Sequence, residues 1–489
     1  MVSNSDGRCG RGLDGRILGA ALVFMLAIGM PALGFAKAPA PAAGAPGPAP
    51  AGQIPALPAQ PASPDAAAPA GCTTPVAQGQ AALVSSPAQQ SKSKPTDGAS
   101  ASKRGGTGPT KPDLKGGSAL SDDPSPTVAA DTASCTLSAA QRYADIAEHG
   151  GWPVLAKALK KGASPDDLAR LRQRLASESD LPPTQDEAAA RAPWDSALTE
   201  AVKHYQSRLG LRQTGIVDET TLKALDVPAA DRARELQASA QRLAVARKLP
   251  FDERHVVVNI PEAAVEAVEG GRVVHRYAAV IGGKDHQSPQ IQAKITDIVV
   301  NPTWTVPSSI IKNEIIPKMA KNPRYLSRMS IKILDGKGRE VNPSRIDWSS
   351  DEATEYTLRQ DSGRKNSLGT LKINMPNKEA VYMHDTPAMA LFGQDYRFLS
   401  HGCVRVDGIY DLAVWLLDGV KGPDGAWDVP AIKEIVKAED KQTIKLKQSV
   451  PVVWVYLDGW ASSDGTVHFR DDIYGLDQAQ PAVPVSQTK

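Results

Sequence analysis

One long stretch near the N-terminus limits how much of this 489-residue chain can fold. Residues 37–135 consist mainly of Ala, Pro, Gly, Ser and Lys, with almost no aromatic side chains. A segment of this composition cannot bury enough apolar surface to offset the chain entropy that folding removes. We therefore expect a disordered linker here, and we expect the folded domains to lie after it.

The segment before the linker has the order of a secretory signal peptide. Arg8, Arg11 and Arg16 precede an uncharged apolar run over residues 17–33, and small residues follow. This order predicts a signal peptide over residues 1–36 that is cleaved on export. The alternative is an uncleaved inner-membrane anchor, although the run is just short of the roughly 20 residues that span a bilayer comfortably.

Charge and cysteine usage narrow the possibilities further. The chain has 56 basic and 54 acidic side chains, so its overall charge does not favour nucleic acid as a partner. Cys72 and Cys135 lie in or beside the linker, where an exported protein can form a disulfide, and two free thiols are the alternative. Cys403 is the only cysteine in the part expected to be globular.

Helical spacing of apolar residues begins near Leu137 and predicts two consecutive helical units. The first, residues 136–190, contains Ser164-Pro165, a pattern typical of an N-cap followed by Pro at the first helical position. The second covers residues 191–228. A further helix over residues 229–251 is expected to link it to the rest of the chain.

Beyond residue 251 the pattern changes to short β-branched runs bounded by Gly, Pro, Asn or Asp. We expect strands over residues 256–260, 273–281, 295–300, 331–334, 371–373, 381–383 and 450–456, and helices over 310–319 and 410–417. These elements predict a mostly β domain over residues 252–440. A β extension at 441–475 and a tail at 476–489 would follow it.

The segment Ser400-His401-Gly402-Cys403 has the residue types of a nucleophile turn. A thiol attacks as its thiolate, and an imidazole such as that of His384, 19 positions earlier, is the usual base. A free cysteine titrates at roughly 8.5, so we expect an imidazolium or a backbone dipole to lower the pKa of Cys403. Gly402 permits a tight turn whose amides face a developing oxyanion.

These residues resemble the signature of the L,D-transpeptidases of bacterial cell-wall synthesis, in which a His is followed by Ser/Thr-His-Gly-Cys. The resemblance is to the large, Gram-negative branch and covers roughly residues 252–411. Its further motifs are Val256-Val257-Val258-Asn259-Ile260-Pro261, Asn301-Pro302-Thr303-Trp304, Val306-Pro307-Ser308-Ser309-Ile310, Ile346-Asp347-Trp348, Asn366-Ser367-Leu368-Gly369 and His384-Asp385-Thr386-Pro387. One departure is the segment 359–364, which lacks the Pro usual in this branch.

A second resemblance concerns the unit at residues 191–228. Gln206 and the run Gly215-Ile216-Val217-Asp218 are similar to a small peptidoglycan-binding domain, and a plain helical bundle is the alternative. Together the resemblances imply an α+β multidomain protein. An α-helical scaffold and the small helical peptidoglycan-binding domain would precede a mostly β L,D-transpeptidase catalytic domain with a capping insertion at about 303–364.

The resemblance also implies roles for the residues of the turn. Cys403 is expected to be the nucleophile and His384 the proton donor and acceptor. The backbone carbonyl of Asp385, rather than its carboxylate, is expected to orient His384. His401 and Gly402 are expected to shape the turn and the oxyanion site.

Four further residues are expected to bind substrate. Arg405 is placed to pair with a substrate carboxylate, with an ordinary ion pair as the alternative. Ser400 is expected to form a hydrogen bond within the site, or to hold the turn. Tyr382 and Trp304 are expected to line the cleft unless they belong to the core.

By resemblance, the chain is a periplasmic L,D-transpeptidase that needs no cofactor and no metal. It would form 3→3 peptidoglycan cross-links, or attach a protein to the wall, through a Cys403 thioester with release of D-Ala. Its partners would be stem peptides and glycan, and carbapenems would acylate the same thiol. The alternatives are an L,D-carboxypeptidase, a non-catalytic peptidoglycan-binding protein, and a zinc site at His384, His401 and Cys403, whose spacing matches no familiar zinc motif.

Overall fold

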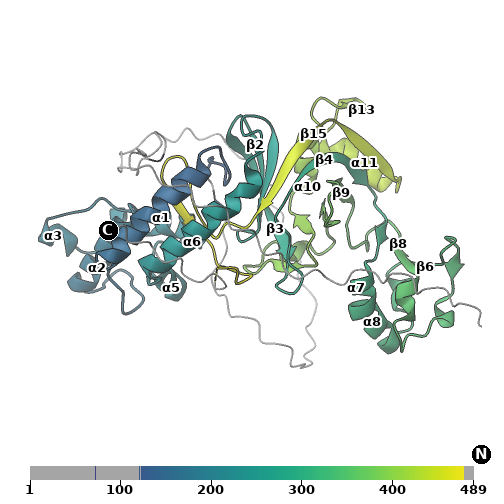
Figure 1. Ribbon diagram of the computed structural model, residues 1–489, viewed down its shortest axis with the longest axis horizontal. Coiled ribbons are helices and arrows are strands. Elements are labelled where there is room, and N and C mark those ends of the chain that lie inside the picture. The colour runs from purple at the N-terminus through teal and green to yellow at the C-terminus, as the bar shows by residue number, and fades with distance from the viewer. Residues whose placement is uncertain (1–71, 73–119, 122, 478–489) are drawn as a thin grey trace, which may run out of the picture. The chain divides into compact units, whose positions relative to one another are not determined.

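The computed structural model describes residues 72, 120–121 and 123–477 of the chain (Figure 1). The predicted signal peptide, the alternative anchor and most of the predicted linker lie outside these residues, as does the tail from residue 478. Among the described helices, none is long and apolar enough to cross a membrane. A helical region precedes a β-rich region, which confirms the predicted α+β fold class.

The helical region is built from α1 (Thr132–Glu148), α2 (Pro165–Ser177), α3 (Glu187–Ala190), α4 (Ser196–Arg208), α5 (Glu219–Leu225) and α6 (Ala229–Arg242). Ser164 accepts a hydrogen bond from the backbone N–H of Asp167, which confirms the predicted helix start. Figure 1 shows α1 and α6 side by side. The helix predicted over 229–251 ends earlier, because α6 passes into a 3₁₀ turn, η1 (Leu243–Ala246).

A C-terminal hairpin completes the core of the helical region. Its strands are β16 (Gly459–Ala461) and β17 (Val467–Phe469). Phe469 packs against Tyr143 of α1, with ring centroids 5.7 Å apart, and Arg208 of α4 donates a hydrogen bond to the Val467 carbonyl. The end of the described chain therefore folds back onto its beginning.

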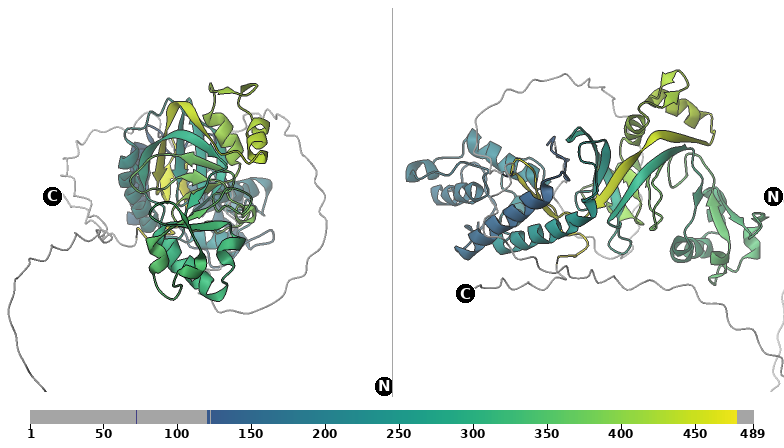
Figure 2. Two further views of the ribbon diagram at one scale, coloured as in Figure 1. Left: turned by 90° about the vertical axis from the view of Figure 1, so that its right-hand side faces the viewer. Right: turned by 45° about the horizontal axis from the view of Figure 1, so that its top comes forward.

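The β-rich region centres on a nine-stranded sheet in the order β11-β3-β12-β10-β9-β4-β15-β1-β2. The strands are β1 (His255–Asn259), β2 (Ala264–Glu269), β3 (Arg272–Gly282), β4 (Ile291–Val300), β9 (Leu371–Asn374), β10 (Met383–His384), β11 (Phe398–Ser400), β12 (Val404–Val406) and β15 (Gln442–Val455). Because β3 pairs with β2 as well as with β12, the sheet closes on itself. Figure 2 shows the long strands β4 and β15 side by side.

β-branched residues of this sheet pack into one buried core with two helices. The helices are α10 (Ile409–Leu416) and α11 (Val429–Lys437), and a short hairpin, β13 (Lys421–Gly422) and β14 (Gly425–Ala426), lies between them in the chain. Each predicted strand overlaps an observed one, although β10 is shorter than predicted. Three strands of this sheet were not predicted: β2, whose sequence carries acidic residues at every third position, and the three-residue strands β11 and β12, which are too short to show a β pattern.

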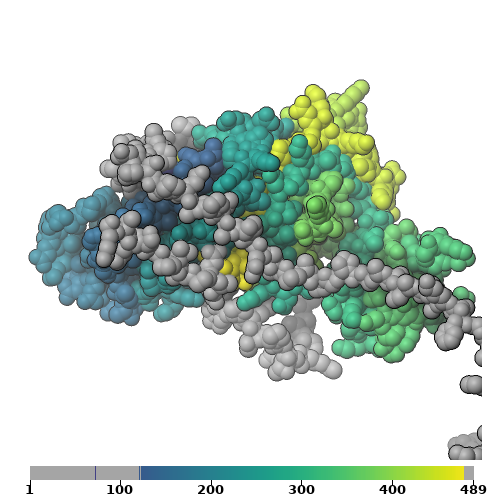
Figure 3. Space-filling model, viewed as in Figure 1, coloured from purple at the N-terminus to yellow at the C-terminus, as the bar shows by residue number. Residues whose placement is uncertain are grey.

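Residues 303–364 form a capping region with its own small core, part of which Figure 3 shows as green atoms at the lower right. Its helical elements are α7 (Ser308–Ile310), the π-helical turn η2 (Ile311–Ile315), α8 (Ile316–Lys321) and α9 (Tyr325–Arg328). Its sheet has the order β5-β8-β6-β7, from β5 (Trp304–Thr305), β6 (Ile331–Leu334), β7 (Glu340–Val341) and β8 (Thr357–Gln360). Short 3₁₀ turns, η3 (Pro343–Arg345) and η4 (Glu352–Glu355), complete it, and η5 (Met389–Leu391) follows β10.

The loop that lacks the expected Pro is held by a buried amide instead. Gln360 donates to the backbone carbonyls of Met329 and Lys365, and it accepts from the N–H of Ser367. The side chain is fully buried. One glutamine therefore satisfies three backbone groups of this loop.

The predicted linker is wrong at its C-terminal end. Arg276 of β3 donates to the backbone carbonyl of Asp123 at 2.7 Å. The backbone N–H and the hydroxyl of Thr127 each donate to the carboxylate of Glu266 at 2.9 Å. These polar contacts fix residues 123–127 on the sheet, and composition alone does not reveal them.

Cys72 and Cys135 form a disulfide, with their Cα atoms 5.2 Å apart. Cys135 is buried within α1, so it belongs to the folded part and not to the linker. Of the two alternatives that the sequence left open, the structure supports the disulfide.

Candidate active site

A cavity of about 240 Å³ lies between the capping region and the large sheet. It contains most of the residues that the sequence analysis singled out, namely Cys403, His384, His401, Ser400, Arg405, Tyr382 and Trp304. The capping region adds Ile310, Glu314, Lys318 and Tyr325. The predicted nucleophile and base therefore share one cavity, and Tyr382 and Trp304 line it as half-buried side chains.

Three neighbouring strands position the basic side chains of the site. His384 of β10 pairs in register with Lys372 of β9 on one side and with Arg405 of β12 on the other. Residues that pair directly across a sheet point to the same face. His384 is therefore flanked by a cation on each neighbouring strand.

His384 is almost completely buried, at 5% exposure. Its Nδ1 lies 2.5 Å from the backbone carbonyl oxygen of Asp385. Burial and the nearby charge of Arg405 lower the pKa of His384 to about 3, although the Asp385 carbonyl opposes this shift. The imidazole is therefore neutral at pH 7 and able to accept a proton.

Cys403 is also uncharged at rest. Burial raises the pKa of its thiol, while hydrogen bonds from Tyr382 and the charges of Lys372 and Arg405 oppose the rise. Within the described residues no hydrogen bond joins the Cys403 Sγ to the His384 ring. The predicted lowering of the Cys403 pKa, by an imidazolium or a backbone dipole, is wrong for the resting site, because burial raises this pKa and keeps His384 neutral. The pair is suited to general-base activation when substrate binds, not to a resting ion pair.

The carboxylate of Asp385 is directed into a turn. It accepts from the backbone N–H and the hydroxyl of Thr370, at 2.8 and 2.7 Å, and from the N–H of Thr386 at 2.7 Å. Its carbonyl, and not its carboxylate, faces His384. The side chain thus fixes the backbone that carries this carbonyl.

Gly369 leaves the space that the Asp385 carboxylate occupies. Its φ is +62°, and a Cβ there would lie 2.4 Å from the Asp385 carboxyl carbon. We expect Gly369→Ala to lower the free energy of unfolding by more than the roughly 1–2 kcal/mol of left-handed strain, and to slow Cys403 acylation about tenfold as His384 loses its orientation. Thermal unfolding and acylation rates measure the two effects. Gly270→Ala is the matched control, since Gly270 has a φ of +59° with open space around it; equal losses in both variants would contradict the expectation.

The turn before the nucleophile is held by Ser400. Its hydroxyl donates to the Cys403 carbonyl at 2.5 Å and accepts from the Gly402 N–H at 3.2 Å. Ser288 donates to the Gly402 carbonyl at 2.7 Å, and the φ of Gly402 is +104°. The Gly402 amide is therefore engaged within the turn, contrary to the expectation that it faces an oxyanion, and Ser400 acts as a turn serine.

His401 connects this turn to the capping region. Its Nε2 lies 2.9 Å from a carboxylate oxygen of Glu314 in η2, and its ring stacks on His286 with centroids 4.5 Å apart. Burial lowers the pKa of His401, and Glu314 opposes the shift. Lys318 holds the second oxygen of Glu314 at 2.5 Å. No sequence motif identifies Glu314, because only the folded capping region brings it to the turn.

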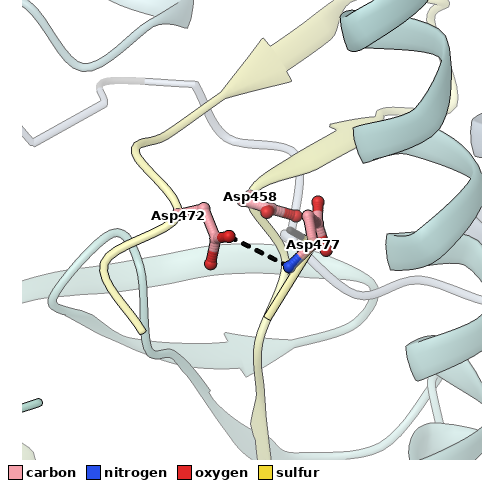
Figure 4. Close-up of side chains that lie close together, drawn as sticks. All are labelled: Asp458, Asp472 and Asp477. Atoms are coloured by element: carbon pink, nitrogen blue, oxygen red, sulfur yellow. Dashed lines mark hydrogen bonds between the residues drawn. The ribbon is translucent and has the colours of Figure 1, made fainter. Parts of the chain in front are cut away.

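A group of three aspartates lies outside this cavity and has the residue types of a cation site. Asp458, Asp472 and Asp477 offer ligand atoms within 4.8 Å of one another (Figure 4). Arg242 already pairs with Asp458 at 3.1 Å and also with Asp477, and Asp472 accepts from the backbone N–H of Asp477 at 3.0 Å. Burial and Asp477 raise the pKa of Asp458 well above its usual range. The Arg242 guanidinium therefore supplies the positive charge that a metal ion would supply to this group. Its ion pair with Asp477 holds the end of the described chain.

The motif at Gln206 holds its domain together. Gln206 is fully buried, donates to the Ile216 carbonyl at 2.8 Å and accepts from the Gly215 N–H at 2.9 Å. Asp218 caps α5. These residues are structural, so any ligand of this domain must meet other, exposed side chains.

The chain matches two known family models. Residues 253–425 match the L,D-transpeptidase catalytic domain, and residues 164–225 match a model described as "Putative peptidoglycan binding domain". The chain therefore carries an L,D-transpeptidase catalytic domain and, before it, a peptidoglycan-binding domain. The second match begins at α2, which the sequence analysis assigned to the scaffold.

One curated relative agrees with this assignment. A Haemophilus influenzae protein named "Putative L,D-transpeptidase" is 32% identical over 246 residues, which are 50% of this chain and 48% of that protein. The chain thus spans about half the length of this curated relative. Solved L,D-transpeptidases from Mycobacterium smegmatis and Stackebrandtia nassauensis are 16% and 14% identical. The match to the M. smegmatis structure covers 41% of this chain and 58% of that one, with a TM-score of 0.20. The match to the S. nassauensis structure covers 62% of this chain and 96% of that one, with a TM-score of 0.22. Both TM-scores are too low to bear on the site.

Proposed function

We propose that the chain is an exported L,D-transpeptidase of the periplasm that forms 3→3 cross-links in peptidoglycan. The observation that carries the proposal is a free thiol, Cys403, sharing a cavity with a buried neutral base, His384. The predicted signal peptide and the peptidoglycan-binding domain agree with a wall substrate.

In the first half-reaction, Cys403 attacks the carbonyl of the third residue of a tetrapeptide stem while His384 takes the thiol proton. The carbon–nitrogen bond to the terminal D-Ala then breaks. His384 returns the proton to the departing amine, and a thioester remains. The Tyr382 hydroxyl, whose hydrogen bond to Cys403 opposes the rise of its pKa, would stabilise the developing oxyanion together with the Cys403 amide.

In the second half-reaction, an amine of another stem attacks the thioester. His384 takes a proton from this amine, and the thiolate leaves and recovers the proton. Attack by the lysine of a wall-anchored protein would attach that protein to the wall, and attack by water would make the site an L,D-carboxypeptidase. Carbapenems would acylate Cys403 by the same first step.

The capping region is placed to limit hydrolysis. Glu314 of η2 contacts His401, which lies two residues before Cys403 in the nucleophile turn. This contact keeps the capping region closed over the thioester. A closed cavity excludes water. The region thus favours transfer to an amine.

We expect Glu314→Gln to raise the ratio of hydrolysed stem to cross-linked dimer several-fold, because the uncharged amide weakens the contacts to His401 and Lys318. Mass spectrometry of the products measures this ratio. Asp351→Asn is the control, since Asp351 forms an exposed ion pair with Lys312 in the same region. An unchanged ratio in Glu314→Gln would contradict the closing role of this contact.

Tetrapeptide muropeptides incubated with the full chain test the proposal itself. A dimer that has lost one D-Ala supports transpeptidation. D-Ala loss without a dimer supports the carboxypeptidase, and unchanged muropeptides that still bind the protein support a non-catalytic binding role. Activity that persists in a chelator excludes the zinc alternative.

A further inference from the structure

Two cations flank the catalytic histidine on neighbouring strands. Lys372 and Arg405 both pair in register with His384, so the backbone of each lies about 5 Å from that of His384, across to the neighbouring strand. Both side chains are only half exposed. Positive charge at this depth requires a negative partner or an aromatic face to be stable.

Lys372 has no acidic partner among the described residues. The carboxylate whose charge reaches it, Asp297, is already engaged, accepting from Thr296 at 2.7 Å and from Asn374 at 2.6 Å. The Lys372 ammonium lies instead over the ring of Tyr382, 4.1 Å from its centroid. An aromatic face, and not an acid of the described chain, therefore contacts this ammonium.

Arg405 also has no acidic partner among the described residues. No described residue forms an ion pair or a hydrogen bond with its side chain, and its buried Nε has no partner. The acid whose charge reaches it, Glu314, is held by Lys318 and His401. The site therefore presents two cations, one on each side of His384, that have no acidic partner among the described residues.

The two cations differ in their access to the cavity. Arg405 lines it, whereas Lys372 does not and lies over the face of Tyr382. Its charge nevertheless reaches Cys403. A group that binds Lys372 must therefore extend from the acylated carbon past Tyr382, which requires a side chain of several carbons.

We infer that Lys372 binds a carboxylate at the far end of the side chain of the donor's third residue, opposite Arg405. The inference rests on the proposed function and adds a specificity-determining residue to it. Lys372 selects a donor whose third residue carries a free carboxylate at the end of its side chain over one in which that group is an amide. A charge-assisted hydrogen bond of this kind corresponds to a preference of about 30-fold.

Two tetrapeptide donors that differ only in a free or amidated distal carboxyl test the inference on the full chain. We expect the wild type to release D-Ala from the free-carboxylate donor with a kcat/KM about 30-fold higher. Lys372→Met should reduce this preference to about one, while any effect of the lost charge on the Cys403 thiol should slow both donors by the same factor. Equal slowing of both donors would show that Lys372 acts only on the thiol, and unchanged rates would show no role; either result overturns the inference.

Two controls distinguish binding by Lys372 from a general effect of charge and from damage to the site. Lys441→Met removes a nearby exposed cation that donates to Thr303, and it should keep the preference. Alkylation of Cys403 by iodoacetamide, which carries no charge, reports whether the site is intact in each variant. A wild type that is alkylated at Cys403 but releases no D-Ala from either donor would overturn the proposed function itself.

Discussion

Replacing Cys403 by Ala is expected to reduce D-Ala release and cross-linking by a factor on the order of 10⁴ or more. No other described side chain in the cavity is a thiol, and loss of the nucleophile removes the covalent route altogether. The substitution takes away one sulfur atom from a half-buried position, so the fold should persist. Muropeptide mass spectrometry and thermal unfolding measure the two properties.

Binding to isolated peptidoglycan provides the control for this variant. The peptidoglycan-binding domain lies at residues 164–225, far from Cys403 in the chain. Cys403→Ala should therefore still bind peptidoglycan. If cross-linking persisted in a variant that folds and binds normally, the assignment of the nucleophile would be wrong.

Replacing His384 by Gln is expected to reduce kcat/KM by about 10²- to 10⁴-fold, because the site loses its general base. The pH dependence should change as well. In the wild type, a His384 pKa of about 3 predicts no acidic limb between pH 5 and 8. In the variant the thiol must ionise unaided, so activity should rise about tenfold per pH unit below the raised pKa of Cys403.

At low pH the chain loses stability, so activity can be compared only above the pH at which the fold is lost. Because the pKa of His384 is lowered by burial, the folded chain keeps this ring neutral while the unfolded chain protonates it near 6.5. Its contribution to stability is present above about pH 6.5 and is lost as the pH falls toward 3. Rates should therefore be compared where thermal unfolding shows an intact fold. An acidic limb near pH 6.5 in the wild type would contradict a neutral, buried base.

The local patterns of the sequence predicted much of the fold. β-branched runs located six of the nine strands of the large sheet, and Ser164-Pro165 located the start of α2, because both signals lie within a few residues. Contacts between distant segments were not visible. The anchoring of Thr127 by Glu266 is an example, since it joins polar groups across 139 positions.

In the candidate site, too, local patterns were predicted and contacts between distant segments were not. The spacing of His384 and Cys403 suggested that they act together, and the structure places both in one cavity. Lys372 and Glu314 were missed, because strand register brings the first to His384 and the capping region brings the second to His401. The direction of the Cys403 pKa shift was also mispredicted, since burial is a property of the fold.

The central claim is a thioester on Cys403, and intact-mass spectrometry of the full chain mixed with a tetrapeptide donor tests it most directly. We predict a mass increase equal to the donor without its terminal D-Ala, located on the peptide that contains Cys403 and released by a nucleophilic amine. No such adduct should form in Cys403→Ala. An adduct on another residue, or D-Ala release without any adduct in rapid-quench samples, would contradict the proposed mechanism.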